Sequence, residues 1–209
     1  VQKLISCCTE REELRLLVAA LHPFVVNLIF DSNGNHVIQE CLKTFNKNDN
    51  TFIFDSIITG SNLVKIATHK HGCCVIQRCI DNGNRQQLIS LTDEIVKNAL
   101  LLVQDAFGNY VVQYILSVPL TGIVYDVTMK LMDQLIALSM QKFSSNVIEK
   151  LVRSDDQEVK QCIFRKFLNY EDVGSLLQDS FANYVIQTCL DESGLCLSVA
   201  LHRGGWVHW

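Results

Sequence analysis

Apolar residues recur along this chain in a pattern that appears five times at nearly constant spacing. Each copy has a position 0 followed by apolar residues at positions +2, +3, +6 and +7, which form the buried stripe of an α-helix. Position 0 is occupied in turn by Asn35, Cys73, Asn109, Ser145 and Asn183. The steps between these residues are 38, 36, 36 and 38. A period in this range predicts an array of stacked helical units rather than a compact enzyme fold.

Several columns of the aligned copies are apolar or small throughout, and we assign them to the core. Seven residues before position 0 stand Leu28, Ile66, Leu102, Leu138 and Leu176. Position +2 is Val37, Val75, Val111, Val147 and Val185, and position +6 is Cys41, Cys79, Ile115, Leu151 and Cys189. Directly before position 0 stand Gly34, Gly72, Gly108, Ser144 and Ala182. These last residues are small, which predicts that two helices approach closely there.

Three other columns are mostly polar, and the core stripe does not explain them. Positions 0, +1 and +4 are occupied by Asn35/His36/Gln39, Cys73/Cys74/Gln77, Asn109/Tyr110/Gln113, Ser145/Asn146/Glu149 and Asn183/Tyr184/Gln187. Residues four apart lie above one another on a helix face, with position +1 to the side. Stacked units would line these triplets into a row. Neutral amides beside aromatic rings suit the edges and faces of unstacked nucleobases better than acid–base chemistry.

Three motifs carry a resemblance to a known family. Gly-Asn-Tyr-Val-Val-Gln ends at Gln113, Ser-Asn-Val-Ile-Glu-Lys ends at Lys150, and Ala-Asn-Tyr-Val-Ile-Gln ends at Gln187. Over residues 1–192 the chain resembles the Pumilio (PUF) family of RNA-binding repeat proteins, which read one base per helical repeat. The five motifs resemble the last five of the family's usual eight repeats, and residues 1–5 resemble the end of a preceding recognition helix. The resemblance implies an all-α fold, a curved α-solenoid or superhelix of stacked three-helix repeats of about 36 residues.

The polar pairs at positions 0 and +4 differ in what they can accept and donate. Uracil offers acceptor, donor and acceptor along its pairing edge, which an Asn/Gln pair can satisfy. Guanine offers two donors that one carboxylate can receive, and adenine offers one acceptor and one amine that a Gln amide can satisfy. The pairs Asn35/Gln39, Asn109/Gln113 and Asn183/Gln187 therefore favour U, Ser145/Glu149 favours G, and Cys73/Gln77 favours A.

Strand direction comes from the family resemblance, which implies antiparallel binding with the C-terminal repeat on the 5′ base. The five repeats then predict 5′-UGUAU, which contains the family's UGUA element. Cys74 departs from the family pattern, because such adenine-reading repeats usually carry Arg or another large side chain there. A thiol offers little ring contact and no cation–π interaction, so we expect weaker retention of the A. Residues 193–209 match no repeat column, and we expect a divergent tail where the family has a capping helix pair.

Composition narrows the class of protein. The chain is 48% hydrophobic and 19% charged, with a net charge of −4, which argues weakly against nucleic acid; we give the triplets more weight. Its 9 cysteines form no Cys-x-x-Cys pair. We expect Cys7, Cys8 and Cys162 to pack, and the compartment to be reducing. The most apolar stretch, 18–30, is interrupted by polar residues and too short to cross a bilayer, so we expect no membrane partner.

Other chemistries fit the residues less well. His69 and His71 lie close to Cys73 in sequence, but a zinc site would break the architecture of that repeat, and no second Cys/His pair has ligand spacing. Glu149 has no partner acid or oriented base. We therefore expect no metal, no cofactor and no enzyme activity. The alternative is a protein-binding scaffold of HEAT or armadillo type, in which position +4 would vary more freely than Gln in four repeats and Glu in one.

The family resemblance also implies a cellular role. Such proteins bind 3′ untranslated regions of mRNA in the cytoplasm and recruit translational repressors or deadenylases. We expect a cytoplasmic monomer that binds single-stranded mRNA with UGUA-type elements and regulates its translation and stability. Protein partners of that kind would contact the convex face.

Overall fold

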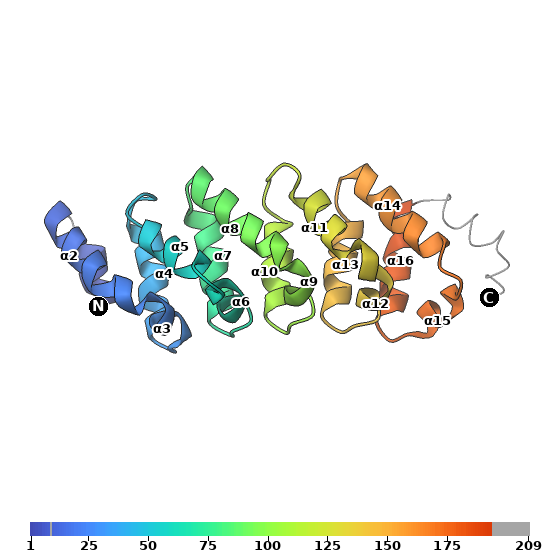
Figure 1. Cartoon of the computed structure of the whole chain (residues 1–209), viewed down its shortest axis with the longest axis horizontal. Coiled ribbons are helices and arrows are strands. Elements are labelled where there is room, and N and C mark those ends of the chain that lie inside the picture. The colour runs from blue at the N-terminus through green and yellow to red at the C-terminus, as the bar shows by residue number, and fades with distance from the viewer. Residues whose placement is uncertain (9, 194–209) are drawn as a thin grey trace. The chain divides into compact units, whose positions relative to one another are not determined.

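The fold was analysed in a computed structural model that describes residues 1–8 and 10–193. The first compact unit, residues 1–98, contains α1 (Gln2–Cys7), α2 (Arg11–Leu21), η1 (His22–Phe24), α3 (Val25–Phe30), α4 (Gly34–Thr44), α5 (Thr51–Ile58), α6 (Asn62–Ala67), α7 (Gly72–Asn82) and α8 (Arg85–Lys97). The second unit, from residue 99 onward, contains α9 (Ala99–Leu102), α10 (Gly108–Ile115), α11 (Ile123–Leu131), η2 (Met132–Gln134), α12 (Leu135–Ser139), α13 (Ser144–Val152), α14 (Gln157–Leu168), α15 (Val173–Gln178) and α16 (Ala182–Ser193). Across these described residues every regular element is a helix (Figure 1).

The helices group into five repeats of three, as the family resemblance implied. Repeat 1 is α2, α3 and α4; repeat 2 is α5, α6 and α7; repeat 3 is α8, α9 and α10; repeat 4 is α11, α12 and α13; repeat 5 is α14, α15 and α16. The boundary between the two compact units falls after Asn98, inside repeat 3. The division into an array over 1–192 and a tail over 193–209 stays a prediction, since residues 194–209 lie outside the described residues.

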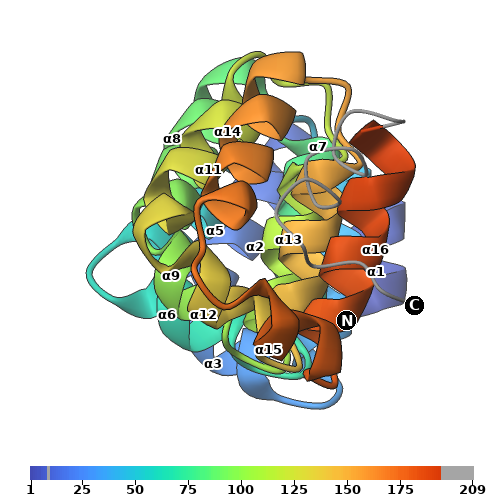
Figure 2. The same cartoon turned by 90° about the vertical axis from the view of Figure 1, so that its right-hand side faces the viewer.

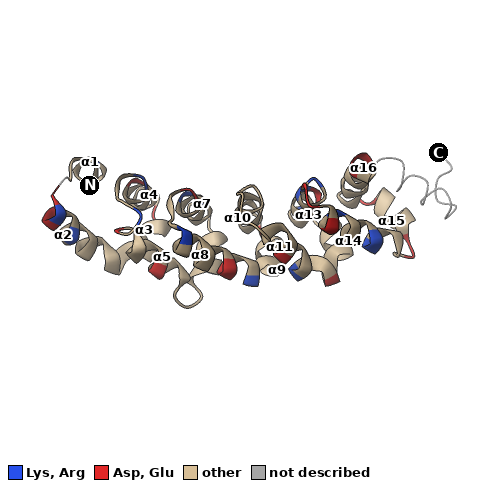
Figure 3. Cartoon of the chain, turned by 90° about the horizontal axis from the view of Figure 1, so that it is seen from above, with Lys and Arg blue, Asp and Glu red and all other residues tan. Residues whose placement is uncertain are grey.

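The third helices of the repeats lie side by side within each unit. In the first unit α1 contacts α4 and α4 contacts α7, so α1 takes the place expected for the end of a preceding recognition helix. In the second unit α10, α13 and α16 follow one another along one side, with α11 and α14 on the other (Figure 3). Figure 2 shows the same pairing of α13 with α16 from the end.

The predicted core columns are buried with few exceptions. Every residue at position +6 is buried, as is every residue at position +2 except Val37, which is half-buried. Of the column seven residues before position 0, only Leu28 is half-buried rather than buried. Cys41, Cys79 and Cys189 are therefore small core hydrophobes, as predicted, and burial raises the pKa of Cys41 to about 12.

The prediction that Cys7 packs is wrong. Cys7 is the last residue of α1 and its side chain is exposed, while Cys8 and Cys162 are half-buried. Nothing in the periodic columns constrains these three positions, because none of them falls in a column of the five motifs. The columns therefore predicted burial reliably only where the repeat itself recurs.

Small residues before position 0 bring the second and third helices of a repeat together. A Cβ added to Gly72 would lie 2.1 Å from the carbonyl oxygen of Ile66, and one added to Gly108 would lie 2.7 Å from that of Leu102. Both distances are far shorter than a carbon–oxygen contact allows. The close approach predicted from the small column is therefore confirmed for these repeats.

One helical run reaches the length and mean hydropathy of a membrane span. It covers Arg11–Phe30 and is longer than the stretch 18–30 considered from the sequence. A single such run is weak evidence, because a helix of a repeat passes the same test. The run is interrupted by the short 3-10 helix η1 at Pro23, and Val25 and Ile29 are buried where α3 packs against α4, α5 and α6. The packing of α3 is that of a repeat helix, whereas α2 contains no buried residue.

Candidate nucleic-acid interface

The polar triplets occupy the first turns of the third helices, and their exposure follows their position. Residues at position 0 are buried in repeats 1 to 4, and Asn183 is half-buried. Every residue at position +1 is exposed, namely His36, Cys74, Tyr110, Asn146 and Tyr184. Residues at position +4 are half-buried except Gln187, which is exposed. A ligand can therefore cover the face of the residue at +1 while its edge approaches the pair at 0 and +4.

In repeats 1, 3 and 5 the third helix begins at a turn that the Asp at the start of the motif closes. The Asp31 carboxylate oxygen Oδ1 accepts from the backbone N–H groups of Asn33 at 2.9 Å and Gly34 at 2.7 Å. Asp105 and Asp179 make the equivalent pair of bonds in repeats 3 and 5. These backbone donors lower the pKa of Asp31 and of Asp179. Each of these aspartates stands three residues before the start of its helix, and Asp shortly before a helix is a capping signal that the sequence contains.

Repeats 1 and 3 arrange the Asn/Gln pair in the same way. In repeat 1 the Asn35 amide nitrogen donates to the carbonyl oxygens of Asp31 and Ser32, both at 2.9 Å. The Gln39 amide nitrogen donates to Asn35 Oδ1, also at 2.9 Å. Repeat 3 shows the corresponding bonds. The helix start thus orients Asn, and Asn orients Gln, so that the Gln carbonyl and one Gln N–H are left to meet a base edge.

Repeat 2 has thiols where repeats 1 and 3 have an amide and a ring. The Cys73 thiol donates to the Lys70 carbonyl oxygen at 3.5 Å, and its sulfur lies 4.0 Å from that of Cys74. Burial and the neighbouring Cys74 raise the pKa of Cys73 to about 11. The Cys73 thiol therefore stays neutral, and sulfur is a weak hydrogen-bonding atom, which leaves Gln77 as the strong hydrogen-bonding group of this triplet.

The two histidines of repeat 2 do not meet these thiols in a metal site. The His69 ring contacts Phe30 and His71 edge-on, with centroid distances of 4.9 and 5.4 Å. Within residues 1–8 and 10–193, no three His, Cys, Asp or Glu side chains are grouped as a metal ion requires. His69 nitrogen Nδ1 instead accepts from the His71 backbone N–H at 3.3 Å, near the start of α7.

Repeat 4 has the only carboxylate at position +4, and that carboxylate is already bonded. Arg153 donates to Glu149 Oε2 at 3.0 Å, and the Thr188 hydroxyl donates to the same oxygen at 3.3 Å. Ser145 points its hydroxyl to the Lys142 carbonyl oxygen at 3.5 Å. Asn146 also donates to that oxygen, at 3.0 Å. Arg153 and Thr188 stand outside the predicted triplets; Arg153 is four residues after Glu149 along the same helix, and only the packing of α13 against α16 reveals Thr188.

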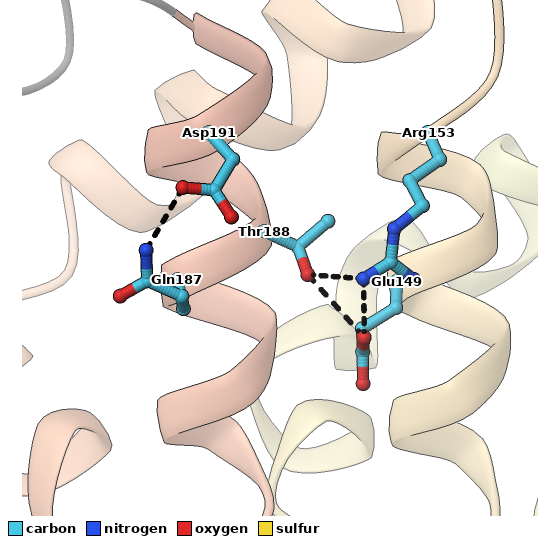
Figure 4. Close-up of polar contacts among 5 residues, drawn as sticks. All are labelled: Glu149, Arg153, Gln187, Thr188 and Asp191. Atoms are coloured by element: carbon cyan, nitrogen blue, oxygen red, sulfur yellow. Dashed lines mark hydrogen bonds and ion pairs between the residues drawn. The ribbon is translucent and has the colours of Figure 1, made fainter.

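Repeat 5 carries the same triplet as repeat 3 but bonds it differently. The Gln187 amide nitrogen donates to Asp191 Oδ1 at 2.9 Å, and not to Asn183. Asn183 keeps its bond to the Asp179 carbonyl oxygen. Figure 4 shows Gln187 and Asp191 facing one another along α16, beside the Glu149 cluster. The residue at position +8 therefore changes the geometry of the residue at +4.

Two cavities open beside the triplets, one in each unit. In the second unit a cavity of about 760 Å³ is lined by Gln113, Glu149, Lys150 and Arg153, together with the loop from Leu116. In the first unit a cavity of about 540 Å³ is lined by residues that include His36, Gln39, Lys43 and Arg78. Each cavity thus joins residues at position +4 to basic side chains, and acidic side chains line it as well, Asp155 and Asp156 in the second unit and Glu40 and Asp81 in the first. Partial burial lowers the pKa of Lys150, which contacts Ser117.

The comparison with protein families decides the assignment. The model of the "Pumilio-family RNA binding repeat" matches residues 1–22, 24–58, 62–96, 98–118, 134–168 and 172–194. The chain belongs to the Pumilio family. A Pumilio domain-containing protein of Schizosaccharomyces pombe is 43% identical over 195 residues, which cover 93% of this chain and 28% of that relative. This Pumilio chain therefore spans less than a third of that relative's length.

Solved structures of the same family match this Pumilio chain. The Puf4 RNA-binding domain bound to the HO endonuclease RNA 3′ UTR recognition sequence has a TM-score of 0.87 and 39% identity, over 97% of this chain and 66% of that one. A Puf4 mutant bound to the Cox17 RNA 3′ UTR recognition sequence has a TM-score of 0.86 and 40% identity, over 96% and 63%. The fold is thus the all-helical Puf repeat solenoid, and family and fold are those of RNA-binding repeat proteins. The assignment of the fifteen triplet residues to RNA contacts stays a prediction.

Proposed function

We propose that this Pumilio chain binds single-stranded RNA containing 5′-UGUAU, with one base read by each of its five repeats. Through this element it regulates the translation and stability of mRNAs from their 3′ untranslated regions, in the cytoplasm. Translational repressors or deadenylase subunits are the partners proposed for its convex face. Support for RNA as the ligand comes from the family and from Puf4, whose solved complexes contain 3′ UTR recognition sequences.

The observation that carries the base assignment is the contrast between repeats 3 and 4. In repeat 3 the pair Asn109/Gln113 offers both amide donors and carbonyl acceptors. In repeat 4 the pair Ser145/Glu149 offers a carboxylate, which accepts and cannot donate. Uracil needs donors for its two oxygens, and guanine needs acceptors for N1–H and its amine. Neighbouring repeats are therefore suited to different bases.

Binding of uracil requires an exchange of hydrogen bonds at Asn109. Both hydrogens of its amide nitrogen donate to backbone carbonyls, those of Asp105 at 2.8 Å and Ala106 at 3.0 Å. A uracil oxygen that takes one of these hydrogens replaces one carbonyl. Such an exchange is close to neutral in free energy, because one hydrogen bond replaces another. The gain in binding must then come from Gln113 and from stacking on Tyr110, at roughly 1–3 kcal/mol per stacked base.

A first experiment tests whether binding depends on sequence. Fluorescence anisotropy with a labelled RNA that contains UGUAU should give a much lower Kd than a shuffled strand of equal composition. Duplex RNA should bind little, since its bases are not available for stacking. Equal affinity for the shuffled strand would contradict sequence-specific reading and favour the alternative, a helical scaffold that binds proteins.

A second experiment tests the base assignment within one repeat. The double variant Ser145→Asn/Glu149→Gln gives repeat 4 the same pair as repeat 3. We expect it to prefer UUUAU over UGUAU, while the native chain prefers UGUAU. Mismatching a good bidentate base contact costs about 1–3 kcal/mol in DNA complexes, so the reversal should be measurable. If both proteins rank the two RNAs identically, Glu149 does not read a base and one-base-per-repeat reading fails here.

A further inference from the structure

Glu149 belongs to a closed group of three polar side chains contributed by two adjacent repeats. Arg153 Nη2 donates to Glu149 Oε2 at 3.0 Å and to the Thr188 hydroxyl oxygen at 2.9 Å. The Thr188 hydroxyl in turn donates to Glu149 Oε2 at 3.3 Å. Figure 4 shows Arg153 and Glu149 on α13 and Thr188 on α16, with the three side chains converging between these helices. One nitrogen thus supplies both of its hydrogens, and each bond supports the others.

The group uses one oxygen of the Glu149 carboxylate and leaves the other available. Oε2 accepts two hydrogen bonds, which fills its two acceptor sites, whereas Oε1 has no partner among the described residues. The Glu149 side chain is 18% exposed and Thr188 is 3% exposed, so the carboxylate and the hydroxyl are largely shielded from water, while the Arg153 side chain is 56% exposed. Shielding strengthens a charge-assisted hydrogen bond and restricts the rotation of the carboxylate.

We propose that Arg153 is a specificity-determining residue of repeat 4, which with Thr188 positions the Glu149 carboxylate so that Oε1 faces a guanine edge. The inference rests on the proposed function, because it concerns how the guanine is chosen. Arg153 acts through Glu149 and is therefore a positioning residue. An Oε1 atom held in one orientation meets a guanine N–H donor at little entropic cost. It also cannot turn away from the acceptor oxygens of uracil, which increases the discrimination.

Position +8 has this role only where its side chain reaches the residue at +4. Arg153 is eight residues after Ser145, and the same column contains Lys43, Asp81, Ser117 and Asp191. Lys43 lines the cavity in the first unit together with Gln39, yet it makes no hydrogen bond or ion pair to Gln39 in the described chain. Lys43 thus has the same charge and column as Arg153 without the contact. It provides the matched control.

The test compares the full chain with Arg153→Met and with Lys43→Met. Kd is measured by fluorescence anisotropy for UGUAU and UUUAU strands. The Kd for UUUAU divided by the Kd for UGUAU reports discrimination between G and U. We expect Arg153→Met to lower this ratio about threefold to tenfold, as loss of a charge-assisted contact would. Lys43→Met removes the same charge, so it should weaken the binding of both strands by the same factor and leave the ratio unchanged. Arg153→Lys keeps a charged donor and should restore part of the ratio.

Two results would overturn the proposal. If Arg153→Met weakens the binding of both strands by the same factor, Arg153 only attracts the RNA backbone. If it raises the ratio, Arg153 competes with guanine for the carboxylate. Should Arg153→Met lose helical content by circular dichroism, Thr188→Val removes one donor at constant charge and similar volume, and an unchanged ratio in that variant overturns the proposal as well. Failure of the proposed function looks different, because the native chain itself would then show no preference for G.

Discussion

Repeats 3 and 5 contain the same triplet, yet their position +4 side chains are bonded to different partners. Both have Asn at 0, Tyr at +1 and Gln at +4, after an Asp that closes the turn. Gln113 donates to Asn109 within the triplet, whereas Gln187 donates to Asp191 outside it. Identity of the three residues therefore does not ensure identity of the surface that a base meets.

The residue at position +8 explains the difference. In repeat 3 this residue is Ser117, whose hydroxyl donates to the Gln113 backbone carbonyl at 3.2 Å and leaves the amide side chain to Asn109. In repeat 5 it is Asp191, one helical turn after Gln187. A carboxylate is a stronger acceptor than a neutral amide oxygen, so it captures the Gln187 N–H. Repeat 3 therefore holds its Gln side chain against the Asn of the triplet, whereas repeat 5 holds its Gln side chain toward Asp191.

The largest expected effect tests whether both repeats hold a base at all. Tyr110 and Tyr184 are 55% and 62% exposed, so each ring can stack on a base. Tyr110→Ala and Tyr184→Ala should each cost about 1–3 kcal/mol of binding free energy to the UGUAU strand, measured by anisotropy. Nearly equal losses would show that the repeats differ only in edge recognition. A negligible loss for Tyr184→Ala alone would mean that repeat 5 leaves its base unbound.

The next prediction concerns the stability of the fold and not the binding of RNA. It compares the packing of the second and third helices in the two repeats. Repeat 3 has Gly108 where repeat 5 has the fully buried Ala182. A Cβ on Gly108 would lie 2.7 Å from a backbone oxygen, so Gly108→Ala should lower the free energy of unfolding by about 1–2 kcal/mol through overpacking. Urea denaturation followed by circular dichroism measures this. An increase in stability would show that α9 and α10 move apart easily, as the corresponding helices of repeat 5 must to accept Ala182.

The smallest expected effect concerns Asp191, the residue at position +8 that distinguishes repeat 5 from repeat 3. Asp191→Ala frees the Gln187 amide to donate to Asn183, as in repeat 3. We expect the preference for U over C at the 5′ base of UGUAU to rise by about 0.5–1 kcal/mol, the value of one hydrogen bond. Ser117→Ala is the control in the same column, and the preference at the base read by repeat 3 should not change. An unchanged preference in Asp191→Ala would show that breaking the Gln187–Asp191 bond costs nothing.

Most of the fold and much of the candidate surface were predictable because they recur. The helix stripe, the small column and the exposed ring at position +1 appear in several copies, and Ile76, Val112 and Ile148 at position +3 are buried as the pattern predicted. Cys7 was predicted wrongly because it lies outside every recurring column. The bonds of Thr188 and Asp191 were not predicted, because positions +5 and +8 differ among the repeats, whereas the spacing of Glu149 and Arg153 already allowed an ion pair on one helix.

What the sequence determined by itself is the set of local, repeated relations. Spacing within one helix and between copies requires no knowledge of packing, so it predicted the repeats, their buried columns and the triplets. Most triplet bonds join residues three or four apart, a spacing that the sequence contains, and only the bond between Thr188 and Glu149 depends on the packing of two repeats. Thr188 is 39 residues after Glu149, and its hydroxyl reaches that carboxylate only because α16 packs against α13. A hydrogen bond depends on positions within a few tenths of an ångström, and a periodic pattern does not contain that information.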